Sequence, residues 1–111
     1  MKHSLFLDLG AEVQIPHDGI LSRTLYNDDH VKVLVFGFDA GQELSAHTAP
    51  MAASLYFVSG EAKLTLGDDV EDVKAGAYAH MPPQLTHGIL AKTPVVMMLQ
   101  MYKQARQATE S

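Results

Sequence analysis

Apolar and polar residues alternate in short runs along the chain, and turn-forming residues separate these runs. The segment 62–66, Ala-Lys-Leu-Thr-Leu, alternates strictly, and the segment 95–102 is almost wholly apolar. Strict alternation is the pattern of a strand with one buried face and one solvated face. Turn signals such as Gly67-Asp68-Asp69 stand between the runs. Strands that recur roughly every 8–12 residues with turns between them are typical of a sandwich or barrel, so the pattern predicts an all-β fold.

The run from Val33 to Phe38 is apolar on both of its faces. A strand has this pattern when both of its sides are covered. A chain of 111 residues has few other elements with which to cover the second side. We therefore expect a subunit interface on this strand, and a homodimer.

Composition narrows the classes of function. The formal net charge of −5, with no basic cluster, argues against binding to nucleic acid or to an anionic membrane. The sequence has no run of about 20 apolar residues, the length that could span a membrane. The N-terminal segment lacks the apolar region and cleavage site of a signal peptide. There is no cysteine to form a disulfide or a thiolate nucleophile. We expect a cytoplasmic protein, and the absence of a nucleophile elbow, a phosphate-binding loop or paired carboxylates weighs against hydrolases and kinases.

Two glycine-bounded segments in the strand-rich part of the chain share a recurring spacing. They read GQELSAHTAPMAASLYFVSG (41–60) and GAYAHMPPQLTHGILA (76–91). Their spacing resembles the two motifs of the cupin superfamily, G-x5-H-x-H-x3-4-E-x6-G and G-x5-P-x-G-x2-H-x3-N. The matching positions are Gly41, His47, Gly60, Gly76, Pro82 and His87. The resemblance implies a small single-domain cupin: a jelly-roll β-barrel of two antiparallel sheets, paired as a homodimer through sheet faces or exchanged N-terminal strands.

The same resemblance shows which motif positions have changed. In metal-binding cupins, three His and one Glu of these motifs hold one ion. Here Ala49 stands at the second His and Ala53 at the Glu, so only His47 and His87 remain as ligands. Protein sites for such ions normally use at least three ligands. The resemblance therefore implies either one divalent metal (Zn, Fe, Mn, Ni or Cu) in a weaker site or no metal at all.

Further residues are candidates for the same pocket. His80, seven residues before His87, restores a third imidazole if its side chain points inward, which the sequence does not fix. Small alanines near His47 leave volume and an apolar wall, as in a small-molecule pocket. The candidate lining residues are Tyr56, Phe57, Ala49, Ala53, Tyr78, Gln84 and Gln100.

Methionines gather in the last predicted strand, at Met97, Met98 and Met101. Methionine is mostly a pliable filler of cores. The alternative is a thioether ligand for a soft ion such as Cu(I).

Three functions stay open at this point. The first is a metal-dependent cupin, as an enzyme an oxygenase or isomerase. The second is a metal-free module that binds a carbohydrate or organic acid. The third is a structural or regulatory dimer with a vestigial pocket. In each case we expect an N-terminal arm with a short strand (1–18), a barrel (19–103) and a polar, helix-like C-terminal tail (104–111).

Overall fold

The structure, a computed structural model, describes residues 2–103. These residues form nine β-strands and one 3-10 turn, which confirms the all-β prediction. The elements are η1 (Leu9–Ala11), β1 (Ile20–Asn27), β2 (Val31–Phe38), β3 (Glu43–His47), β4 (Ala53–Ser59), β5 (Glu61–Leu66), β6 (Asp69–Lys74), β7 (Tyr78–Met81), β8 (His87–Ala91) and β9 (Val95–Tyr102). The expected C-terminal tail lies outside the described residues.

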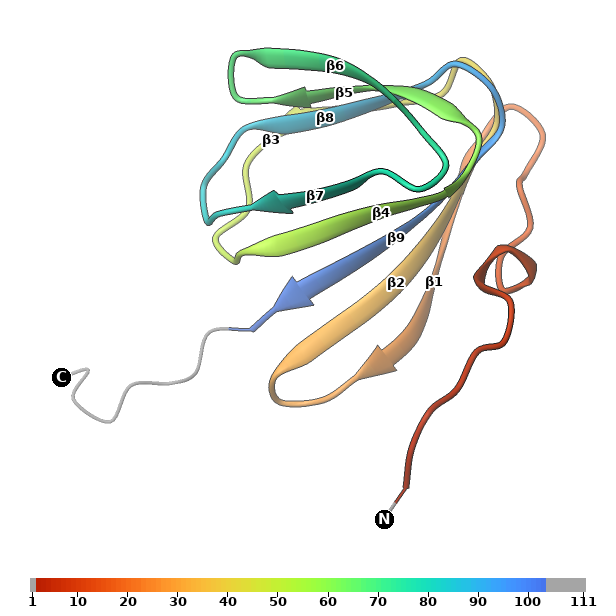
Figure 1. Ribbon diagram of the computed structural model, residues 1–111, viewed down its shortest axis with the longest axis vertical. Helices are drawn as coiled ribbons and strands as arrows, with labels where there is room; N and C mark the ends of the chain where they lie inside the picture. Colours follow the sequence, from red (N-terminus) through yellow and green to blue (C-terminus); the bar gives the residue numbers. More distant parts are fainter. Residues whose placement is uncertain (1, 104–111) are drawn as a thin grey trace, which may run out of the picture.

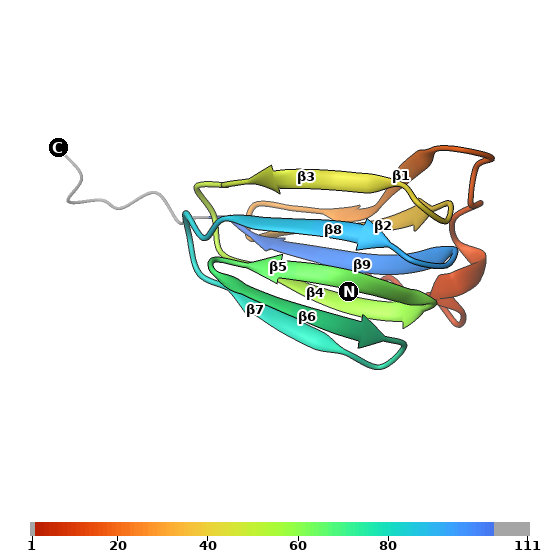
Figure 2. The same ribbon diagram turned by 90° about the horizontal axis from the view of Figure 1, so that it is seen from above.

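The strands form two antiparallel sheets that face each other (Figures 1 and 2). The first sheet has the order β1-β2-β9-β4-β7, and the second has the order β3-β8-β5-β6. β1 with β2 and β5 with β6 are hairpin neighbours, whereas other neighbours are far apart in sequence, as β2 with β9 and β3 with β8. The chain therefore crosses repeatedly between the sheets, and this brings the two motif segments onto adjacent strands. Among the described residues, no helix is long and apolar enough to cross a membrane.

The main core lies between the sheets and follows the two-residue period of the strands. Leu55 and Phe57 of β4 are 1% and 0% exposed, while Tyr56 between them is 37% exposed. Phe38 of β2 and Met97 of β9 join the same cluster. Burying each such side chain contributes about 1.5–3 kcal/mol. Where a strand is regular, the alternation fixes which of its residues can reach the barrel interior.

The outer side of the five-stranded sheet carries a second, smaller core. Val35 and Val96 pack there against Val13 of the N-terminal arm. The second apolar face of β2 is thus covered in part by the arm of the same chain, a cover that the sequence interpretation did not consider. The arm itself has the turn η1 and no strand among residues 2–18, so the expected short strand was wrong. Asp8 caps this turn by accepting a hydrogen bond from the Gly10 amide at 3.1 Å, which favours a turn over extended backbone.

The glycines that bound the motifs have identifiable backbone roles. Gly60 has φ +87° between β4 and β5, and a Cβ there would overlap the carbonyl oxygen of Pro94. Gly41 and Gly76 have φ +83° and +97° with open space around them. Positive φ favours glycine, so the motif spacing marks the turns that place the strands.

Candidate functional site

His47 and His87 face each other inside one end of the barrel. They are register partners on the neighbouring strands β3 and β8, and their ring centroids are 4.3 Å apart. The register of β3 shifts between Leu44 and His47. Such a bulge changes the facing of later residues, so Leu44 packs on the main core and His47 still reaches the interior. His87 is buried and His47 is exposed.

The two imidazoles are held in the same way by the backbone. Nδ1 of His47 lies 2.9 Å from the carbonyl oxygen of Ser45, and Nδ1 of His87 lies 2.9 Å from that of Leu85. A carbonyl oxygen can only accept, so each Nδ1 carries a hydrogen and donates the hydrogen bond. In a neutral imidazole the other ring nitrogen, Nε2, then carries a free lone pair. This tautomer and this orienting bond are those of histidine metal ligands.

A cavity of about 90 Å³ adjoins both rings. Apart from the imidazoles, the side chains around it are apolar or thioether groups. They are Ala49, Met51, Ala53, Met81, Pro82, Leu85, Leu99 and Met101. No carboxylate or thiolate is among them. Pockets for organic ligands usually have roughly 300–1,000 Å³, so this cavity suits an ion with its small ligands better than a sugar.

Two of the candidate lining residues, Ala49 and Ala53, lie at this cavity. Phe57 points inward as expected, but it is fully buried in the core and is not part of the cavity wall. Gln84 is exposed in the turn before β8, where φ is +68° and its amide donates to the carbonyl of Ala49. The structure therefore brings the alanines, but not Phe57 or Gln84, to the imidazoles.

The remaining candidates lie on the outer face of the five-stranded sheet. His80 pairs with Ser54 in register, whereas its neighbour Met81 lines the cavity. Because neighbouring residues of a strand point to opposite faces, His80 points away and supplies no third imidazole. The sequence left the facing of His80 open, and its outward position on β7 separates it from His47 and His87. Tyr56, Tyr78 and Gln100 have the same outward facing.

The sequence interpretation missed Met51 and Met81 in the cavity wall. It considered Met101, but only as part of the methionine-rich last strand. One signal was available: Met81 immediately precedes Pro82 and lies within the second motif segment. The sheet face on which Met81 lies depends on the register of β7 against β4, which the sequence alone does not give.

A larger cavity of about 440 Å³ lies elsewhere, between the N-terminal arm and the outer face of the five-stranded sheet. Phe6 and Leu9 of the arm line it on one side, and Val33 and Met98 of the sheet line it on the other. It is open and has no contact with the two barrel imidazoles.

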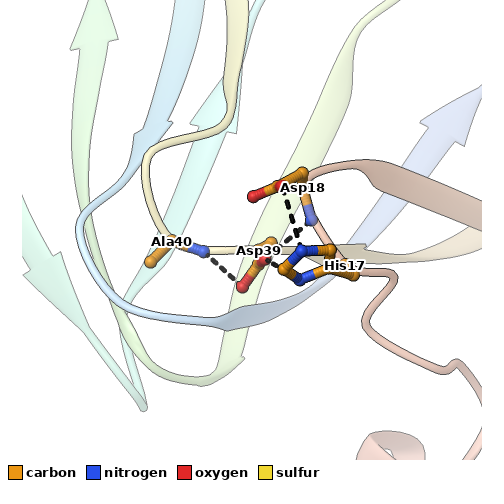
Figure 3. A network of polar contacts seen from close by, with 4 residues as sticks. All are labelled: His17, Asp18, Asp39 and Ala40. Atoms are coloured by element: carbon orange, nitrogen blue, oxygen red, sulfur yellow. Dashed lines mark hydrogen bonds and ion pairs between the residues drawn. The ribbon is translucent and has the colours of Figure 1, made fainter.

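A second group of possible metal ligands lies in the loops outside the barrel (Figure 3). Ligand atoms of His17, Asp18 and Asp39 are within 4.8 Å of one another. Asp39 accepts hydrogen bonds from the amides of Asp18, at 2.8 Å, and Ala40, at 2.9 Å. These two bonds, the Asp18 bond foremost, hold the pKa of Asp39 below its usual value. The group connects the arm to the loop after β2.

The comparisons with known proteins agree with this architecture. The family model of the cupin domain matches residues 34–101. A conserved protein of unknown function from Streptococcus pyogenes is 33% identical, with 96% of this chain and 93% of that chain covered and a TM-score of 0.83. No curated protein matches the chain.

Two more distant structures share the fold. A cupin superfamily protein from Desulfitobacterium hafniense is 21% identical, with 94% of this chain and 95% of that chain covered and a TM-score of 0.84. An RmlC-like cupin from Shewanella frigidimarina is 20% identical, with 96% and 95% covered and a TM-score of 0.78. The resemblance of the two motif segments is thereby confirmed at the level of family and fold.

Proposed function

This chain belongs to the cupin family, and we propose that it is a metal-binding member that holds one transition-metal ion in its barrel through His47 and His87. The observation that carries the proposal is the backbone bond to each Nδ1, at 2.9 Å in both rings. It leaves both Nε2 lone pairs unused. Unused imidazole nitrogens beside one cavity are a ready pair of metal ligands.

The residues around the pair decide what else the site supplies. Among the described residues, no Asp, Glu or third His completes a ligand group with His47 and His87. Two imidazoles leave coordination positions for small ligands, and a bound metal would act as a Lewis acid toward an oxygen ligand there. The chain's own part is to hold two nitrogens and to surround them with an apolar wall that limits water. An oxygenase or isomerase would need those open positions.

Cavity size separates this proposal from the metal-free alternative. At about 90 Å³ the cavity is well below the roughly 300–1,000 Å³ of organic-ligand pockets. A carbohydrate would not fit beside the imidazoles without displacing the wall. The structural alternative, a vestigial pocket, predicts instead that the histidines can be removed without any loss of binding.

Metal analysis of the purified, tag-free chain tests the proposal. The protein is dialysed, reconstituted separately with Zn, Fe, Mn, Ni and Cu, and its metal content measured by mass spectrometry. We expect about one ion per chain in the wild type and in His17→Ala, and none in the His47→Ala, His87→Ala double variant. Metal near zero in the wild type, or equal metal in the double variant, would overturn the proposal. Circular dichroism checks that each variant is folded.

A further inference from the structure

Three methionines from separate segments converge on the cavity beside the two imidazoles. Met51 lies in the loop before β4, Met81 ends β7, and Met101 lies on β9. Met81 and Met101 are both register partners of Ala53, one on each side of β4. Neighbouring residues across strands have Cβ atoms about 5 Å apart, so two long thioether side chains flank one methyl group.

The cavity wall has thioether side chains and lacks the carboxylate of the cupin motif. Ala53 occupies the position where the resembling motif has its Glu. With alanine there, no carboxylate neutralises a cation, and the neighbouring side chains are thioethers. Hard divalent ions prefer oxygen ligands, whereas thioethers favour soft ions such as Cu(I), which imidazoles also bind.

The charge of the cavity wall also favours Cu(I) over a divalent ion. The cavity wall supplies only neutral ligands: two imidazoles with protonated Nδ1 atoms and the thioether sulfurs. The cost of burying an uncompensated ion rises steeply with its charge, since the Born energy depends on the square of the charge. A monovalent ion therefore loses far less than a divalent ion in this apolar wall.

We propose that the cavity is a soft-metal site that binds cuprous ion through Nε2 of His47, Nε2 of His87 and thioether sulfur from Met51, Met81 or Met101. The proposal rests on the imidazole site proposed above and adds the softness and the charge of the ion. Ala53 contributes to the proposed site, because its small side chain leaves the space that the flanking thioethers enter.

The test compares cuprous ion and zinc in matched variants. Anaerobic Cu(I) is titrated against a chromogenic chelator, and Zn(II) affinity is measured in parallel. The variant Met51→Leu, Met81→Leu, Met101→Leu keeps side-chain volume and removes the sulfurs. The control Met98→Leu lies on the outer side of the sheet, at the other cavity. We expect the triple variant to lose at least about 10-fold in Cu(I) affinity, with Zn(II) affinity unchanged and no effect of the control.

The outcomes separate the two proposals. Wild-type Cu(I) affinity in the triple variant, or an X-ray absorption spectrum with nitrogen but no sulfur neighbours, overturns the thioether site and leaves the imidazole site standing. Loss of neither metal in the His47→Ala, His87→Ala double variant overturns both. Should the triple variant fail to fold, Met51→Leu and Met101→Leu, at half-buried positions, provide the same comparison singly.

Discussion

Two groups of potential metal ligands in this protein differ in number and in surroundings. The loop group of His17, Asp18 and Asp39 has three ligand-type side chains within 4.8 Å, whereas the barrel group has two imidazoles. The loop group is nevertheless the poorer site. His17 is 92% exposed, and both oxygens of Asp39 already accept amide protons (Figure 3). The comparison teaches that unused lone pairs on held side chains matter more than the count of ligands.

The difference has a thermodynamic cause. Exposed side chains must lose rotamer freedom before they can hold an ion together, and this loss opposes binding. In the barrel that ordering is already achieved, because each ring donates to a backbone carbonyl and His87 is packed. The barrel site is thus joined to the folded core through His87, and the loop group is a connection on the surface.

The largest expected effect follows from the site's place in the core. Met81 is 2% exposed, so Met81→Ala should lower the free energy of unfolding by about 2–4 kcal/mol. His17→Ala should leave the free energy of unfolding unchanged within the error of the measurement, since the His17 side chain is 92% exposed. Urea denaturation of both variants measures the two effects. A loss below about 1 kcal/mol for Met81→Ala would show that the cavity wall is not part of the core.

Adding a ligand to each group sharpens the comparison. Ala49 lines the cavity at the position of the missing second motif histidine, so Ala49→His should raise Zn(II) affinity by about 100-fold. Ala40 adjoins Asp39 and is itself exposed, so Ala40→His should change Zn(II) affinity little, because no packed wall would hold the new side chain. Calorimetric titration compares the two. Equal gains at both positions would mean that the ligand count, and not the surroundings, sets affinity.

The two barrel histidines should themselves differ in their effect on stability. His87 is 9% exposed and bonds to Leu85 within the packed wall, whereas His47 is exposed. His87→Ala should therefore cost about 1–2 kcal/mol of unfolding free energy, and His47→Ala less. Thermal unfolding without added metal measures both. Equal losses would indicate that His47 is as well packed as His87.

Much of the barrel and half of its site could be predicted from the sequence. The spacing of Gly41, His47 and His87 carried the fold and the histidine pair, because strand alternation and motif spacing depend on local sequence alone. The facing of His80 and of Met81 could not be predicted, since it depends on the register of β7 against β4. The loop group joins His17 to Asp39 across two strands, and that proximity follows only from the pairing of β1 with β2.

The smallest expected effect is the pH dependence that the loop group contributes. The Asp18 amide, followed by that of Ala40, lowers the pKa of Asp39 in the folded chain below its ordinary value of 3.8. A lowered folded pKa means that the carboxylate stabilises the fold above that value and that the contribution is lost as pH falls below it. Asp39→Asn should flatten the fall of the urea midpoint below pH 4 and leave metal affinity unchanged.

Asp28 provides the matched comparison for that measurement. Its pKa is lowered to about 2, mainly by the hydroxyl of Tyr26 and then by the amides of His30 and Val31. The contribution of Asp28 to the free energy of unfolding should therefore be lost between about pH 4 and pH 2. Asp28→Asn should flatten the fall of the urea midpoint in acid more than Asp39→Asn does. If Asp39→Asn instead weakened metal binding while leaving the acid limb intact, the loop group would be a metal site after all, and burial would not be what separates the two groups.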